Sequence, residues 1–311
     1  MIDISILLQI IWTGLAASTY AVLFAVAFSL VLKVVKVWNF AQAGIMALSF
    51  YVMYAAHQKW GLPLLPSVGI GLTVTIAASV FMDTYGLQTL RARNSPNLTF
   101  FIFTLVVSEF LAYLLAMIFG TEPVALTQSI MSGVNIINGI VISNWDLQAL
   151  AVTIVLLVLL YLFIDRTRDG QFMAAVADNP DLSRLYGINV KRAYVITFVL
   201  ASMLITAGMY LFGTRASMIP NTPLQMMLFA VISTLLGGMG RIFGAALAAI
   251  GLSLIQGLSI FVIPSEWQSL ILYVFLFITI LFFPQGVNMQ KFKQLMRTAR
   301  KTMPSAQQKG P

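Results

Sequence analysis

Few residues in this 311-residue chain could carry out acid–base or nucleophilic chemistry. There is no cysteine and one histidine, His57, so a thiol nucleophile and a cysteine-ligated metal are excluded. Catalysis requires a nucleophile with a base, paired acids or converging metal ligands, and one histidine at the outer end of an apolar segment supplies none of these. The chain also lacks a Gly-x-x-x-x-Gly-Lys-Ser/Thr run, which forms the phosphate-binding loop of many ATPases. We therefore expect no catalytic residue, metal site or cofactor, and any ATP-driven activity needs a second polypeptide.

Glu109 is the acidic side chain with the clearest functional potential. It lies near the middle of an apolar stretch, and carboxylates at membrane depth are costly and often functional. One interpretation is an ion-coupled secondary transporter that uses this carboxylate. Another is a neutral, hydrogen-bonded carboxyl group that faces a helix bundle. A passive channel is a third hypothesis, because a solute such as urea needs no energy input to equilibrate.

The elements that must position such residues are apolar helices. Apolar residues make up 59% of the chain and charged residues 9%, against ~25% charged residues in a soluble domain. The sequence therefore predicts an all-α polytopic membrane protein of about eight to ten helices in one domain, residues 1–286. Its segments cover about 6–32, 40–56, 62–83, 98–119, 147–164, 193–213, 224–236, 242–262 and 267–283. The segment 224–236 is short for a full crossing, which predicts a half-helix or a re-entrant element.

The basic residues indicate orientation. With the N-terminus outside and alternating directions, only Lys59 and Arg215 of the 18 Lys and Arg residues fall outside, and the other sixteen fall on the cytoplasmic side. This positive-inside bias predicts an N-out, C-in chain. The charges lie between apolar runs, so the formal charge of +8 indicates a topology signal and a lipid partner, not nucleic acid.

Residues 287–311 form a basic cytoplasmic tail. Met289, Phe292 and Met296 recur there at helical spacing among Lys and Arg residues. The pattern fits a surface helix on the anionic leaflet or a disordered tail, and the sequence leaves both open.

The longest polar stretch before the tail, residues 166–192, divides into two short helices. The first covers about 170–178 and has Phe172, Ala175 and Val176 on one face. Short helices are marginally stable alone in water, so this face must be buried against the bundle or a partner.

The second helix has clear start and stop signals. Asn179 is in an N-cap position, Pro180 is at the first helical position, and Gly187 ends the helix. Its apolar stripe consists of Leu182, Leu185 and Tyr186. Again the bundle itself and a partner are both candidates for covering the stripe.

These residues carry a resemblance to a known family. The loop 168–193 resembles the ATPase-coupling loop of permease subunits in branched-chain amino acid ABC importers. Asn39-Phe40-Ala41-Gln42 and Gly237-Gly238-Met239-Gly240 resemble two further motifs of that family, and Phe283-Pro284-Gln285-Gly286 resembles its exit from the last span. The likeness runs in order from about Gly14 to Gly286.

The resemblance implies an importer in the bacterial cytoplasmic (inner) membrane. Its parts would be this permease, a second homologous permease, two cytoplasmic ABC ATPases and an extracytoplasmic solute-binding protein. The implied ATPase-coupling residues are Phe172, Val176, Leu182, Arg184, Leu185, Tyr186 and Gly187. The implied solute is a branched-chain or other amino acid, urea or a short amide.

The chain departs from the family pattern at Glu109, where the family is ordinarily apolar, and at three further places. Gln42 takes the position of the usual His, Arg241 stands where a small Ser is typical, and 87–93 lacks the usual Glu and Pro. These departures bear on which solute is carried.

A translocation path without membrane charges would use small residues and amides. Glycines let helices approach closely, and broken helices present backbone amides to a polar solute. The predicted path residues are Asn39, Gln42, Gly44, Asn221, Gly237, Gly238 and Gly240. Plain tight helix packing explains each of them equally well.

Overall fold

The computed structural model describes residues 4–127, 133–137, 140–259 and isolated residues between 267 and 281. The predicted tail at 287–311, with Met289, Phe292 and Met296, lies outside the described residues.

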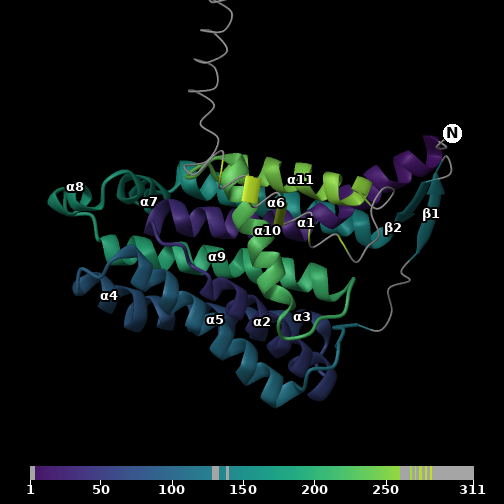
Figure 1. The fold of residues 1–311 in the computed structure, drawn as a ribbon, viewed down its shortest axis with the longest axis horizontal. Helices are drawn as coiled ribbons and strands as arrows, with labels where there is room; N and C mark the ends of the chain where they lie inside the picture. The colour runs from purple at the N-terminus through teal and green to yellow at the C-terminus, as the bar shows by residue number, and fades with distance from the viewer. Residues whose placement is uncertain are drawn as a thin grey trace, which may run out of the picture.

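Apart from one hairpin, the regular structure of the described part is helical (Figure 1). Six of its helices are long and apolar enough to cross a membrane, which makes the chain a multi-pass membrane protein. The helices are α1 (Ile4–Val35), α2 (Ala41–Tyr54), α3 (Leu64–Phe81), α4 (Gln88–Ala92), α5 (Asn97–Phe119), α6 (Asn144–Arg166), α7 (Arg168–Asp178), α8 (Pro180–Leu185), α9 (Val190–Gly213), α10 (Thr222–Gly237) and α11 (Ile242–Ser259). π-Helical turns, Ala55–Lys59 and Met82–Leu87, extend α2 and join α3 to α4.

Helix α1 is the centre of the bundle. It contacts α6, α7, α9, α10 and α11, and 83% of its most apolar stretch is buried. The corresponding share is 17% in α6 and 22% in α5, although both are as apolar as α1. Because their exposed residues are also apolar, these outer helices present lipid-facing surfaces.

Two breaks between helices bear on the predicted path residues, and the sequence predicts the second of them, at 237–240. The chain breaks between α1 and α2, where Lys36 has a φ of +58°, and between α10 and α11, where Gly238 and Gly240 have φ values of +92° and +83°. Both α2, with 14 residues, and α10, with 16, are shorter than the membrane-crossing helices. In Figure 1, α10 runs across the long helices and not along them.

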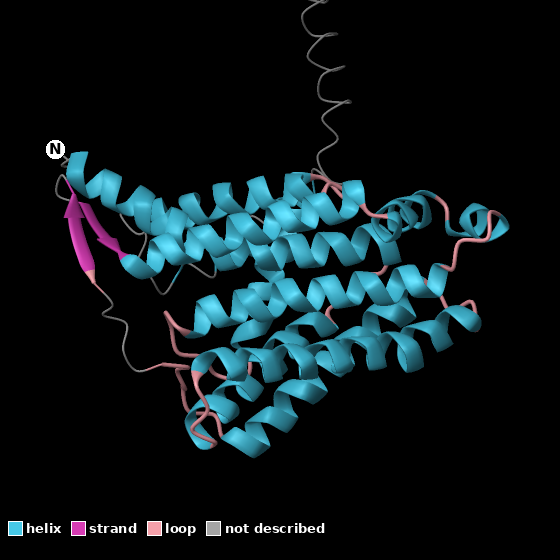
Figure 2. Ribbon diagram, turned by 180° about the vertical axis from the view of Figure 1, so that it is seen from behind, coloured by secondary structure: helices cyan, strands magenta, loops and turns pink. Residues whose placement is uncertain are grey.

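A two-stranded antiparallel hairpin, β1 (Val134–Ile137) and β2 (Ile140–Ser143), precedes α6 and was not expected (Figure 2). Its position is fixed by α1, because the Gln9 side-chain amide exchanges two hydrogen bonds with the Val141 backbone, at 2.7 and 3.2 Å. The Trp12 indole also donates to the Asp146 carboxylate at 3.0 Å. The sequence contains one signal for a hairpin, the dipeptide Asn138-Gly139, which is typical of tight hairpin turns.

Candidate functional site

The loop 166–192 forms the two predicted short helices, α7 and α8. The Thr167 hydroxyl accepts a hydrogen bond from Gly170 N at 3.0 Å and caps α7. The Asn179 side chain accepts from the backbone N–H groups of residues 181 and 182, both at 3.0 Å, and caps α8. Gly187 follows α8 with a φ of +79°, a conformation that favours glycine. The capping predictions for the second helix are confirmed.

Helix α7 turns its apolar face into its own chain. Met173 and Val176 are 1% and 0% exposed and belong to the hydrophobic core, whereas Phe172 is 43% exposed. This corrects the expectation that Val176 contacts a partner. The inward position follows from the contacts of α7 with α1, α6 and α9, which cover the stripe that Val176 and Met173 share. In α7 only Phe172, of the predicted coupling residues, remains available to a partner.

Helix α8 turns its apolar stripe outward. Leu182, Leu185 and Tyr186 are 50%, 84% and 79% exposed, and Ser183 is the residue of α8 that is buried. Arg184 and Gly187 are also exposed. The hydrophobic core of the chain does not bury this stripe, so the core does not stabilise the six-residue helix through it. Helix α8 therefore has an apolar surface available for a partner.

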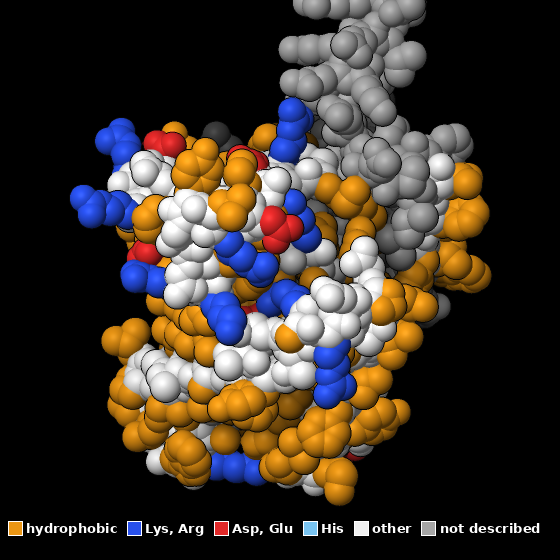
Figure 3. All heavy atoms as spheres, turned by 90° about the vertical axis from the view of Figure 1, so that its left-hand side faces the viewer, with side chains coloured by type: hydrophobic (Ala, Val, Ile, Leu, Met, Phe, Trp, Pro, Cys, Tyr) orange, Lys and Arg blue, Asp and Glu red, His pale blue; other side chains and the backbone are white. Residues whose placement is uncertain are grey.

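Basic side chains surround this stripe at one end of the bundle. Arg184 pairs with Asp181 at 3.4 Å and Arg192 pairs with Asp169 at 3.0 Å. The Lys36 ammonium, at the end of α1, donates to the backbone oxygen of Asp178 at 3.3 Å. Figure 3 looks onto this end and shows Lys and Arg side chains spread among apolar ones.

A buried ion pair that the sequence does not predict connects this end to α9. Asp83 is fully buried, accepts from Gln88 at 2.9 Å and pairs with Arg91 at 3.1 Å. The Arg91 guanidinium lies 4.3 Å from the centre of the Tyr194 ring, one turn into α9. The sequence shows 87–93 as a basic loop, whereas the structure shows that Arg91 joins α4 to α9, the helix that follows residues 166–192.

Three residues for which the sequence predicts a functional role line one small cavity. Gly44, Glu109 and Asn221 surround about 90 Å³ between α2, α5 and the start of α10. A Cβ atom on Gly44 would lie 2.9 Å from the Cα atom of Ser108, so the glycine permits the close approach of α2 and α5. Glu109 is half-buried, and no ion pair involves it among the described residues. The described residues contain no group of three or more acidic or histidine side chains that could hold a metal ion.

The amides of Asn39 and Gln42 are buried elsewhere. They are 0% and 1% exposed, and within the described part of the chain none of their side-chain nitrogen or oxygen atoms has a hydrogen-bond partner. The backbone around them is satisfied, because the Thr104 hydroxyl donates to Trp38 O and accepts from Phe40 N, both at 3.2 Å. An unpaired buried amide costs free energy. These two side chains are therefore the strongest candidates in the interior for polar groups that contact a solute.

The glycines of the α10–α11 turn form a backbone contact. A Cβ atom on Gly237 would lie 2.2 Å from the backbone of Gly244, and the turn is closed by Gly238 and Gly240 at positive φ. None of them lines the cavity beside Glu109. The predicted path residues therefore fall into three separate groups, and close helix packing accounts for the glycines at the turn.

Comparisons with known proteins show the family of this chain. BraD of Pseudomonas aeruginosa, a high-affinity branched-chain amino acid transport system permease protein, is 26% identical over 292 residues, which cover 90% of this chain and 95% of BraD. LivH of Escherichia coli, with the same description, is 27% identical over 293 residues, 90% of this chain and 94% of LivH. A probable LivH of Methanocaldococcus jannaschii is 23% identical and covers 91% of this chain and 93% of its own length.

The family model described as "Branched-chain amino acid transport system / permease component" matches residues 10–281, most of the chain. This protein therefore belongs to the permease components of branched-chain amino acid ABC transport systems, which are not themselves enzymes.

Proposed function

We propose that this permease imports a branched-chain amino acid across the bacterial cytoplasmic membrane as one of two homologous permease subunits. A solute-binding protein delivers the amino acid and two cytoplasmic ABC ATPases supply the energy. Family membership implies ATPase and binding-protein partners. Membership also favours the importer over an ion-coupled carrier based on Glu109 and over a passive channel.

The observation that carries the proposal is the exposed stripe of α8. Leu182, Leu185 and Tyr186 lie at a cation-rich end of the bundle, next to paired charges, which is a polar setting and not a lipid-facing one. Tyr and Arg are enriched where partner proteins bind tightly, and Arg184 stands within the stripe. An ATPase groove that accepts these side chains would bury them.

Helix α7 gives such a contact a route into the bundle. Its Met173 and Val176 are embedded in the core that α1 and α9 share, so α7 is a rigid base for α8. A displacement of α7 and α8 by the ATPase would reach α9, which both helices contact, and would reach α4 through the contact of Arg91 with Tyr194.

The proposal includes the topology. The chain crosses the membrane about eight to ten times, counting short elements, with the N-terminus outside and the C-terminus inside. Residues 1–286 form the permease domain, 166–192 the ATPase-coupling loop and 287–311 the basic cytoplasmic tail. The cation-rich end is then cytoplasmic, as the positive-inside rule requires.

The experiment replaces Leu182, Leu185 and Tyr186 together with Ser. Membrane insertion should be normal, whereas the ATPase should no longer co-purify and ATP-driven leucine uptake should stop. The matched control is Leu65→Ser, because Leu65 is 83% exposed at the opposite end of the bundle. A triple variant that retains its full complement of ATPase and still transports leucine would show that α8 is not the coupling surface.

A further inference from the structure

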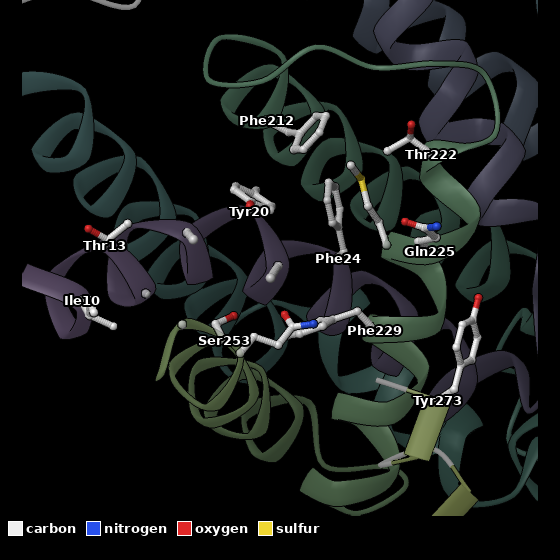
Figure 4. A pocket seen from close by; sticks show the side chains of 16 residues that line it. Ile10, Thr13, Tyr20, Phe24, Phe212, Thr222, Gln225, Phe229, Ser253 and Tyr273 are labelled. Atoms are coloured by element: carbon white, nitrogen blue, oxygen red, sulfur yellow. The ribbon is translucent and has the colours of Figure 1, made fainter. Parts of the chain in front are cut away.

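The described part of the chain contains a second cavity, larger than the one beside Glu109, that neither the sequence nor the family description assigns. It measures about 550 Å³ and lies between α1, α10 and α11 (Figure 4). A volume of this size is typical of small-molecule sites. Its α1 residues run from Ile10 to Phe24, so it occupies the half of the membrane domain that the proposed topology places toward the outside.

The lining combines aromatic and neutral polar side chains. Phe24 and Phe229 supply apolar walls from α1 and α10. The amides of Gln225 and Gln256 and the hydroxyl of Ser253 come from α10 and α11, and Figure 4 shows Gln225 and Ser253 on different sides of the space between the helices. The described lining contains no charged side chain.

The polar lining groups have capacity to bind a ligand. Within the described residues, the side chains of Tyr20, Gln225, Ser253 and Gln256 make no hydrogen bond to the protein. Side-chain amides that face hydrocarbon without partners are costly. Their convergence on one cavity therefore indicates a polar occupant, which lipid tails do not provide.

We propose that this cavity is the outer solute site of the permease, and that it selects a zwitterionic amino acid with an aliphatic side chain. This inference rests on the proposed function. The amides of Gln225 and Gln256 and the Tyr20 hydroxyl bind the ammonium and carboxylate groups. Phe24 and Phe229 contact the aliphatic side chain.

The absence of charged side chains from the described lining determines which solutes this site binds. A zwitterion has no net charge, and neutral donors and acceptors can satisfy both of its groups. A lysine-like or glutamate-like solute brings one more charge, whose desolvation this lining cannot offset. Urea lacks an apolar part, so the aromatic walls would not contribute to its binding.

Helix α10 separates this site from the smaller cavity. Gln225 and Phe229 face the large cavity, whereas Asn221 and Leu224 face the small one beside Glu109. The solute must therefore pass α10 to reach Gly44 and Asn221, which makes this short helix the partition between the outer site and the interior.

The cysteine-free sequence makes a direct test available. Gln225→Cys and Ser253→Cys are introduced singly into the complete importer in proteoliposomes and labelled with a water-soluble thiol reagent. With ATP present, leucine-loaded binding protein should slow labelling several-fold compared with unliganded binding protein. The control Ser217→Cys lies in an exposed loop outside the cavity and should label equally under both conditions. Leu159→Cys, on the lipid-facing side of α6 and 55% exposed, should resist the water-soluble reagent.

Transport kinetics provide an independent readout. Gln225→Leu or Gln256→Leu removes one hydrogen-bonding group and should raise the KM for leucine about three- to tenfold, with the ATPase still bound. The site is refuted if ATP-driven leucine uptake proceeds in these variants with unchanged KM and without protection of the cysteines.

The remaining outcomes identify another occupant. Cysteines that stay unlabelled in the complex regardless of leucine would show that the second permease covers the cavity. Labelling only by a membrane-permeant reagent would show that lipid fills it. ATP-driven uptake of urea in place of leucine would refute the site and leave the importer standing, whereas wild-type protein without any ATP-driven uptake would refute the proposed function itself.

Discussion

The buried carboxylate of Asp83 and the buried amides of Asn39 and Gln42 differ in whether their polar atoms have partners. The Asp83 carboxylate is held by Arg91 and Gln88, so its charge is compensated and its role is structural. The amides of Asn39 and Gln42 have no such partners in the described residues, although both are buried. An unpaired buried amide destabilises the conformation that contains it. Such a group is expected where another conformation or a passing solute forms the missing hydrogen bonds.

Replacing Gln42 distinguishes these roles. An unpaired buried amide destabilises a protein by about 1–3 kcal/mol, so Gln42→Leu should raise the thermal unfolding temperature of the purified permease while lowering leucine uptake. The contrasting variant is Asp83→Leu, which leaves Arg91 without its partner and should lower the unfolding temperature. A destabilised Gln42→Leu protein with normal uptake would mean that the amide is structural.

For the helices, the caps could be predicted from the sequence, whereas the contacts between helices far apart in the chain could not. The cap of α8 follows from Asn179 and Pro180, which act on neighbouring backbone groups, and the sequence shows it directly. The burial of Val176 depends on the distant helices α1 and α9, so helical periodicity alone could not decide whether its face meets a partner. Asp83 was missed for a different reason, because a local π-helical turn, which regular helical spacing does not predict, brings it to Arg91.

The close contact of α10 with α11 can be tested with two glycines. A Cβ atom on Gly237 would meet the Gly244 backbone at 2.2 Å, whereas a Cβ atom on Gly251 meets nothing within 4 Å. Gly237→Ala should therefore destabilise the protein by about 1–3 kcal/mol through overpacking. Gly251→Ala, within α11, should be neutral or slightly stabilising because alanine favours the helix. The comparison uses the unfolding temperature of each purified variant, and equal values would contradict the close contact of the two helices.

At the scale of the whole molecule, the two ends of the bundle differ in charge. Lys36, Arg91 and Arg192 lie at the end that carries α7 and α8. At the other end, Lys59 lies over the Phe119 ring at 4.6 Å and Arg215 over the Trp145 ring at 5.0 Å. The charge asymmetry predicted from the sequence thus has a structural counterpart, and the positive-inside rule gives it a direction.

Reporter fusions measure that direction. Fusions after Arg93, Arg192 or Gly310 should be cytoplasmic, and fusions near Gln58 or Thr127 should be outside. Gln58 lies at the same end as the chain near Thr127, because its side chain donates to Leu126 O at 2.9 Å. An external signal from the Arg192 fusion would reverse the proposed orientation of α7, α8 and everything after them.

ATP hydrolysis by a separate subunit is proposed to drive uptake through this permease. The most direct measurement follows leucine uptake by the complete importer in proteoliposomes, with ATP and without an ion gradient, for wild type and Glu109→Gln. ATP-dependent uptake is expected from both proteins, with the variant above half of wild type, because the amide preserves the shape of the side chain and ATP-driven import does not require its carboxylate. Uptake that requires a proton or sodium gradient, does not depend on ATP and is lost in Glu109→Gln would contradict ATP-driven import.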